Sequence, residues 1–223
     1  IRDSSYSYQD QAVLYRTNAQ SRLIEERCIF YNIPYRLVGG VNFYQRKEVK
    51  DILSYLKVVD NGLDDLAVRR IINVPRRGIG AATIEKINVY AVEHNISFLD
   101  ACFSADSIDT LGNAKKKING FADLIREFRR KMQEGSLEEL FKYITDETGY
   151  IANLKAEETE EAEGRIENIN ELLNKVVTYE QEAEEASLSE LLEEIALVAD
   201  IDNLEDSDNR VVLMTLHRAK GLE

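Results

Sequence analysis

The chain has 223 residues, 44% of them hydrophobic, and a formal net charge of −13 at pH 7. This length is enough for one large or two modest domains with real cores, and no apolar run approaches the ~20 residues that a membrane span needs. Two isolated cysteines, Cys28 and Cys102, form no CxxC motif, so we expect a reduced, cytoplasmic protein in which Cys28 is a small buried side chain.

The negative charge is confined to one region. Residues 1–133 carry a net charge of +5, residues 134–209 carry −20, and residues 210–223 carry +2. Salt screens charges beyond a Debye length of ~8 Å, so a basic face can work on one side of an acidic molecule. The overall charge therefore does not exclude nucleic acid as a partner.

An α/β segment opens the chain. The apolar core of QAVLYR, residues 12–15, predicts a short buried strand. SRLIEERCIFYN predicts a helix, and PYRLVGG predicts a second strand that ends in glycines. A strand, a helix and a strand within about 30 residues are typical of one βαβ unit in a parallel sheet.

Helices are predicted from residue 44 onward. Apolar residues recur at i, i+3, i+4 and i+7 in KEVKDILSYLKVV, and similar stripes mark residues 118–132, 137–144 and 188–195. Ser136 with Glu139, and Ser187 with Glu190, have the spacing of capping boxes at two helix starts.

An acidic run begins at Glu157 and continues through EETEEAEGRIENINELLNKVV. Four of its apolar residues lie on one face of the helix that it predicts: Ile166, Ile169, Leu173 and Val176. The solvated outer face of a packed helix explains the carboxylates, and an acidic partner site is the alternative. Nothing in the run resembles the alternating Asp/Asn loop of a calcium site, so we expect no metal site.

The last segment returns to a strand. IDNLEDSDN is a polar linker, and the apolar run of RVVLMTLH, residues 211–214, suits a buried parallel strand. Strand signals at both ends with helices between them predict a mostly α chain. Its helical subdomain, about residues 44–209, is inserted into a partial α/β domain with a parallel sheet, formed by residues 1–43 and 210–223.

The stretch RRGIGAATIEKI combines two arginines with a Gly-Ile-Gly hairpin and the start of a helix at Ala81 or Thr83. The glycines permit positive φ values and let the backbone approach a ligand, and the first N–H groups of the helix point toward the hairpin. A helix, this hairpin and a second helix can hold one DNA phosphate backbone without reading bases. The alternative is an ordinary turn between helices that needs Gly for its geometry.

Two further stretches place polar side chains at the carboxyl ends of predicted strands. Arg16 and Asn18 follow the first strand, and Thr215 and His217 follow the last. Ligands bind at this edge of open parallel sheets, and Arg and Asn can both donate to phosphate. For the first stretch, a capped turn with a solvent-exposed Arg explains the residues equally well.

Motifs for independent catalysis are absent from the sequence. It contains no GxxxxGK[ST] phosphate loop, no HExxH pair and no nucleophile elbow. We therefore expect the chain on its own to hydrolyse nothing.

The chain resembles the superfamily 1 DNA helicases of the UvrD/PcrA/Rep group, most closely its PcrA-type members. The resemblance rests on five stretches: AVLYRTNAQSR, IPYRLVGGVNFYQRKEVKDILSYL, RIINVPRRGIGAATIEKI, RIENINELL and VVLMTLHRAKGLE. They occur in the family's order and spacing and span nearly the whole chain. The resemblance implies part of the second of two RecA-like domains together with its inserted helical subdomain, so we expect a fragment of a longer protein.

The resemblance also implies roles for individual residues. In the family, the positions that contact single-stranded DNA correspond here to Arg16, Asn18, Thr215 and His217. The hairpin that meets duplex DNA matches Arg77, Gly78, Ile79, Gly80 and Thr83, and Arg76 beside it is a further candidate contact. Glu223 matches the glutamate that holds the nucleotide ribose.

The function implied is that of an ATP-dependent 3′-to-5′ DNA helicase that unwinds duplex DNA in repair or replication. ATP and Mg²⁺ serve the parent protein, whose phosphate loop and metal-binding acids belong to the other RecA-like domain. We expect neither to be bound by this fragment, and we expect no ATPase activity from it.

The expected partners are single-stranded and duplex DNA, and the helical subdomain is a candidate surface for repair, replication or transcription proteins. Two alternatives stay open. One is a non-enzymatic DNA-binding module built on the helix-hairpin-helix alone, and the other is an acidic helical scaffold that docks a basic protein.

Overall fold

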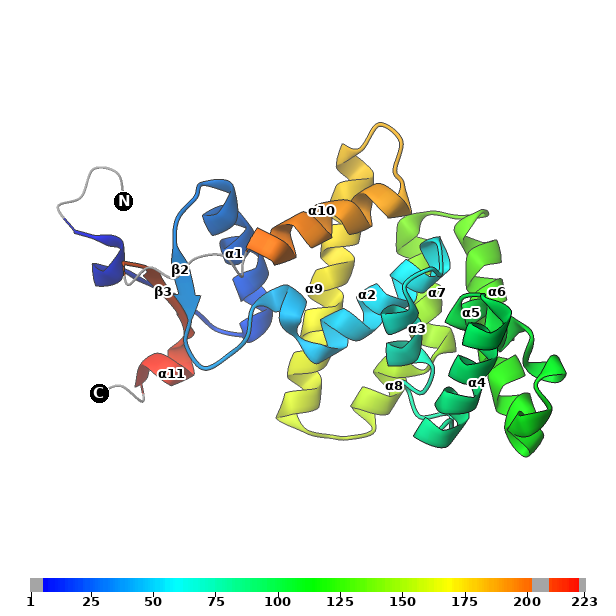
Figure 1. The fold of residues 1–223 in the computed structure, drawn as a ribbon. Coiled ribbons are helices and arrows are strands. Elements are labelled where there is room, and N and C mark those ends of the chain that lie inside the picture. Colours follow the sequence, from blue (N-terminus) through cyan, green and yellow to red (C-terminus); the bar gives the residue numbers. More distant parts are fainter. Residues whose placement is uncertain (1–5, 202–208, 221–223) are drawn as a thin grey trace. The chain divides into compact units, whose positions relative to one another are not determined.

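The structure is a computed structural model that describes residues 6–201 and 209–220 (Figure 1). The chain divides into two compact units. Unit 1 comprises Ile1–Lys50, Glu158–Lys175 and Glu193–Glu223, and unit 2 comprises Asp51–Glu157 and Val176–Leu192. The predicted limits of the inserted subdomain, near residues 44 and 209, differ from the limits of these units and stay a prediction.

Unit 1 holds a three-stranded parallel sheet of β1 (Ala12–Tyr15), β2 (Tyr35–Leu37) and β3 (Val211–Thr215). β3 lies between the other two strands, with Tyr15 beside Thr215 and Leu37 beside Leu213. α1 (Ser21–Phe30) connects β1 to β2, and α11 (Leu216–Lys220) follows β3 directly. The predicted strands and the helix between the first two are confirmed.

The edge strand β1 is less buried than its sequence predicts. Ala12, Val13 and Leu14 are exposed, and only Tyr15 is buried. Among the described strands β1 pairs with β3 alone, so it forms the edge of this sheet, and the prediction of a buried strand is wrong here. β3 is paired on both sides, and its apolar run is largely buried as predicted.

Most of the chain between β2 and β3 is helical. The α-helices are α2 (Lys47–Asp60), α3 (Asp65–Ile71), α4 (Ala81–His94), α5 (Phe98–Phe103), α6 (Lys115–Met132), α7 (Leu137–Glu147), α8 (Tyr150–Lys155), α9 (Glu160–Glu182) and α10 (Leu188–Ile201). Short 3-10 helices are η1 (Tyr8–Asp10), η2 (Asn18–Gln20), η3 (Phe43–Gln45), η4 (Ala105–Ser107) and η5 (Asp109–Ala114). The predicted fold class, mostly α with a partial parallel-sheet domain, is confirmed.

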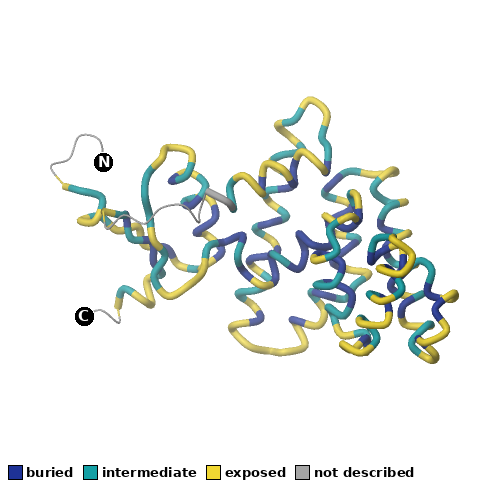
Figure 2. Tube along the Cα trace, viewed as in Figure 1, coloured by how far each residue is buried: buried dark blue, intermediate teal, exposed yellow. Residues whose placement is uncertain are grey.

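The predicted apolar stripes of α6 and α7 form part of the core of unit 2. Ile118, Phe121, Ile125 and Phe128 of α6 are all fully buried, and Figure 2 shows buried positions recurring along the helices. Burying one such side chain stabilises the fold by about 1.5–3 kcal/mol. At the start of α7 the predicted capping box is present, because Ser136 accepts from the N–H of Glu139 while the Glu139 carboxylate accepts from the N–H of Ser136.

None of the helices in the described part of the chain combines the length and the hydropathy that a bilayer span requires.

Candidate nucleic-acid interface

An open groove of about 580 Å³ lies at the carboxyl edge of the sheet in unit 1. Four predicted DNA-binding residues line it, namely Arg16 and Asn18 after β1, Thr215 at the end of β3, and His217 in α11. The parallel neighbours β1 and β3 end at the same edge, so residues from the two ends of the sequence meet here. The expected grouping is thus present, and contact with DNA stays a prediction.

Hydrogen bonds hold the turn between β1 and α1 in one conformation. The Gln20 side-chain oxygen accepts from the N–H groups of Arg16, at 2.9 Å, and Thr17, at 3.3 Å. The turn therefore satisfies its own N–H groups and leaves the side chains of Arg16 and Asn18 exposed. This is the capped turn that the sequence offered as an alternative, and it leaves the arginine free to face a ligand.

The charges around the groove are divided between two sides. The exposed cations are Arg16, after β1, and Lys47, at the start of α2, where the buried Glu48 also lines the groove. On the other side α9 contributes a run of carboxylates at its first two turns: Glu160, Glu161, Glu163 and Glu167. Arg165 of α9 forms an ion pair with Glu161. Coulomb attraction and repulsion therefore favour a phosphate on the sheet side of the groove and disfavour one along α9.

A largely buried guanidinium that the sequence did not single out, that of Arg46, also lines the groove. Nη1 of Arg46 donates to the carbonyl oxygen of Asn18 at 2.9 Å and to Oδ1 of Asn168 at 2.7 Å. Its Nη2 donates to Oγ of Ser21 at 2.7 Å and lies 3.8 Å from the Glu25 carboxylate. Burial lowers the pKa of Arg46, and the negative charges of Glu25 and Glu48 oppose this change.

A second buried ion pair joins α1 to α9 within unit 1. Arg22 pairs with Glu26 at 3.0 Å and with Glu171 at 2.9 Å. The Tyr44 hydroxyl donates to Glu26 at 2.6 Å, and burial together with that carboxylate raises the pKa of Tyr44 well above 10. No sequence signal marked this cluster as a whole, since Glu171 lies 149 positions from Arg22, although Glu26 is only four positions away on α1.

The Gly-Ile-Gly hairpin lies in unit 2 between α3 and α4, and its two glycines differ. Gly78 has a φ of +72°, the left-handed region that favours glycine, whereas Gly80 has a φ of −91° and open space where a Cβ atom would lie. The expectation of positive φ is therefore wrong for Gly80. Gly80 is instead the N-cap of α4, which begins at Ala81 as predicted and has no side-chain cap.

The predicted hairpin residues also differ in exposure. Arg76, Gly78 and Gly80 are exposed, and Thr83 is half-buried. The side chain of Ile79 is buried, so only its backbone can approach a ligand. Asn73, which the sequence analysis missed, holds the hairpin by accepting from the N–H groups of Arg77, at 2.9 Å, and Ile79, at 3.1 Å.

The guanidinium of Arg77 is used within the chain. Nη1 donates to the carbonyl oxygens of Ile71, at 3.0 Å, and Val74, at 3.1 Å, and Nη2 donates to the Tyr55 hydroxyl at 2.6 Å. It also lies over the rings of Tyr55 and Phe121. Arg77 therefore supports the end of α3 and the hairpin, and its contact with DNA stays a prediction.

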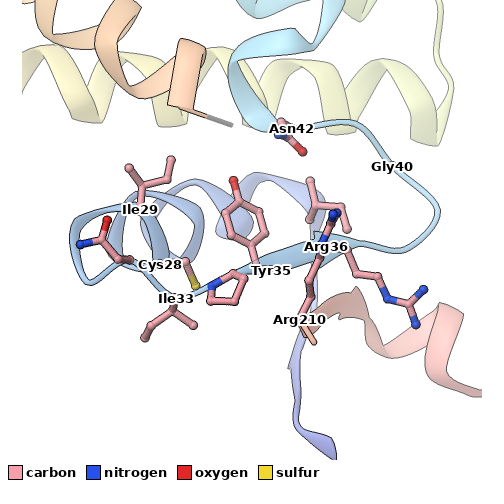
Figure 3. A pocket seen from close by; sticks show the side chains of 11 residues that line it. Cys28, Ile29, Ile33, Tyr35, Arg36, Gly40, Asn42 and Arg210 are labelled. Atoms are coloured by element: carbon pink, nitrogen blue, oxygen red, sulfur yellow. The ribbon is translucent and has the colours of Figure 1, made fainter. Parts of the chain in front are cut away.

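A smaller pocket of about 260 Å³ lies beside α1 and β2 (Figure 3). Its lining combines apolar groups with Arg36, Arg210 and the buried side chain of Cys28. The burial of Cys28 confirms the prediction of a small core side chain. None of the predicted site residues that the structure describes lines this pocket.

The whole chain, residues 1–223, matches the UvrD-like helicase C-terminal domain. The chain belongs to the UvrD-like helicase family. It is 44% identical over 218 residues to an ATP-dependent DNA helicase PcrA of Staphylococcus aureus, which covers 97% of this chain. It is 43% identical over 222 residues, 99% of this chain, to a protein of the same name from Staphylococcus epidermidis. The chain spans 30% of the length of each relative.

Family membership favours the helicase interpretation over the two alternatives, the isolated DNA-binding module and the acidic scaffold.

In the described part of this UvrD-like chain, neither β1 nor β3 leads into a glycine-rich loop of the kind that holds phosphate. The N–H groups of Arg16 and Thr17 after β1 are taken by Gln20, and β3 passes into α11 without a glycine-rich loop. Within the described ranges no group of three or more His, Cys, Asp or Glu side chains is placed to hold a metal ion. Glu223, the predicted ribose contact, lies outside the described residues.

Proposed function

We propose that this chain is the DNA-holding part of an ATP-dependent DNA helicase, and that its groove in unit 1 holds a single strand by the phosphate backbone. The observation that carries the proposal is the meeting of Arg16, Asn18, Thr215 and His217 in one groove. All four side chains can donate hydrogen bonds to phosphate oxygens, and none is placed in a rigid array that would read base edges.

The charge pattern of the groove gives the strand an orientation. Phosphates lie on the side of Arg16 and Lys47, and the sugars and bases face α9, whose carboxylates repel phosphate. A backbone held in this way can be released and taken up again at the next nucleotide, which is what a translocating enzyme requires of a sequence-independent contact.

The hairpin in unit 2 is the proposed contact for duplex DNA. Exposed Arg76, the two glycines and the uncapped first turn of α4 offer a charge and backbone N–H groups to one phosphate. Arg77 and Asn73 hold this backbone in place from within. With so few donors, the non-specific affinity is expected near the weak end of the usual range, about 10⁻⁴ M at physiological salt.

In this proposal the whole protein unwinds DNA, moves in the 3′-to-5′ direction, acts in repair or replication and uses Mg²⁺. ATP supplies the free energy for movement when it is bound there, and the residues described here hold and orient the DNA. A cytoplasmic location follows from a chromosomal or plasmid DNA substrate. The inserted helical subdomain is the proposed surface for protein partners.

Titration of a fluorescent dT20 strand with the 223-residue chain, followed by anisotropy, tests the groove. Arg16→Ala should weaken binding roughly 3- to 10-fold and reduce the magnitude of the salt slope by about 0.7, as expected for one lost phosphate contact on a single strand. His217→Ala should also weaken binding. Arg27→Ala is the matched control, because Arg27 is exposed on α1 of the same unit but does not line the groove. An equal loss with Arg27→Ala would mean that only net charge matters.

A further inference from the structure

One buried side chain touches both walls of the groove in unit 1. Arg46 has a side chain only 9% exposed, and a single nitrogen of it donates to the Asn18 carbonyl oxygen and to Asn168 of α9. Asn18 lies on the sheet side of the groove, and Asn168 lies one turn from the carboxylates of the other side. The guanidinium of Arg46 therefore links the two walls directly.

The remaining contacts of Arg46 fix the orientation of that guanidinium. Its second nitrogen donates to Ser21 in the first turn of α1, and Nε donates to the Val41 carbonyl oxygen at 3.4 Å. Ser21 in turn donates to Glu25, whose other oxygen accepts from the N–H of Phe43 at 3.0 Å. A planar fork with donors at fixed angles can join these groups at once, and a lysine ammonium cannot.

The partners of Asn168 extend the same network. Its amide nitrogen donates to the Glu48 carboxylate, so the amide oxygen is oriented toward Arg46. Glu25 and Glu48 are themselves buried and balance the charge of the guanidinium. The cluster is thus built around Arg46, with partners drawn from the β1–α1 turn, α1, α2 and α9.

We propose that Arg46 is a positioning residue for the single-strand groove, acting by holding Asn18 from behind while it anchors α9 through Asn168. Arg46 is part of the groove lining, but its nitrogens donate to groups of the chain itself, so its role is to set where the Asn18 side chain meets the phosphate. This inference rests on the proposed function of the groove.

The experiment is a double-mutant cycle on the 223-residue chain, with dT20 binding measured by anisotropy at two salt concentrations. Asn18→Ala and Arg46→Lys are each expected to weaken binding roughly 3- to 10-fold. Because Arg46 acts through Asn18, the double variant should bind within about twofold of the weaker single variant, rather than showing the product of the two losses. The salt slope of Arg46→Lys should equal that of the parent, since no phosphate contact is removed.

Two further variants separate positioning from general loosening of the fold. Asn168→Ala removes one anchor of the same guanidinium and is expected to weaken binding about threefold, again without adding to Asn18→Ala. Arg22→Lys is the matched control, since it changes another buried arginine that joins α1 to α9 but does not contact Asn18. It should bind within about twofold of the parent. Circular dichroism checks that each variant folds. If Arg46→Lys does not fold, the Asn168→Ala variant tests the positioning role in its place.

Three results would overturn the positioning role while leaving the groove as the binding site. The losses of Asn18→Ala and Arg46→Lys could be additive in the double variant, or Arg46→Lys and Asn168→Ala could both bind as the parent does. The control Arg22→Lys could also lose as much binding as Arg46→Lys. A parent chain that does not bind dT20, or an Asn18→Ala variant that binds as the parent does, would overturn the proposed function of Asn18 in the groove and the inference with it.

Discussion

Replacement of Arg77 by alanine tests whether the hairpin arginine is first a structural residue. The substitution removes the hydrogen bonds to the carbonyl oxygens of Ile71 and Val74 and to the hydroxyl of Tyr55. Nη1 carries two hydrogens and can therefore donate to two of these carbonyl oxygens at a time. Tyr55 is fully buried, and its hydroxyl also donates to Val74 at 2.5 Å.

The magnitude follows from the groups that lose a partner. Three hydrogen bonds from a charged donor are lost, together with the contact over the Tyr55 and Phe121 rings. The carbonyl oxygens of Ile71 and Val74 each keep one other donor, the N–H of Val74 and the hydroxyl of Tyr55 respectively. Arg77 is half-buried, so solvent replaces part of this interaction. We expect the free energy of unfolding to fall by about 2–4 kcal/mol.

Urea denaturation monitored by circular dichroism measures this change. Arg76→Ala is the control at the neighbouring position, because Arg76 is exposed, and it should alter the unfolding free energy by less than about 0.5 kcal/mol. Arg76→Ala should instead reduce the salt dependence of duplex binding. If Arg77→Ala kept the parent's stability and lost duplex binding, the guanidinium would serve DNA and the structural argument would fail.

Two other properties can be measured on the same preparation. Gly78→Ala should lower the free energy of unfolding by about 1–2 kcal/mol, because its φ of +72° disfavours a side chain. Gly80→Val should cost less than about 1 kcal/mol yet weaken duplex binding, since its Cβ enters open space where the backbone meets phosphate, and parent-like binding would reduce the hairpin to a simple turn. Burial, with a contribution from Asp65, raises the pKa of the Cys102 thiol from 9.0 to about 12. The stabilising contribution of the neutral thiol is therefore complete below pH 9 and is lost as the pH rises toward 12. Between pH 9 and 11 the parent should lose up to about 1.4 kcal/mol per pH unit more than Cys102→Ala in urea denaturation, and parallel curves would contradict this.

Local patterns predicted the elements well, because apolar periodicity and capping depend on neighbours in the sequence. The stripe of α6 and the capping box of α7 are examples. The position of β3 between β1 and β2 was not predictable in this way, since strand order depends on contacts between distant segments. The exposure of Val13 and Leu14 was missed for the same reason.

The candidate site shows the same division. The strand-end rule correctly grouped Arg16 with His217, but nothing indicated that α9 would form the other side of the groove. Arg46 and Lys47 are adjacent cations in the sequence, yet one is buried and the other is exposed. Only their position relative to α1 and α9 distinguishes them.

The central claim is that the groove holds a single strand by its phosphates, regardless of sequence. The most direct test is the affinity of the 223-residue chain for two 20-nucleotide strands of unrelated composition, measured by anisotropy between 50 and 200 mM salt. We expect the two affinities to lie within about threefold of each other. The logarithm of the binding constant should fall linearly with the logarithm of the salt concentration, with a slope of about −1.4 for two phosphate contacts. A salt-independent affinity, or a preference of more than about tenfold for one strand at every salt concentration, would contradict it.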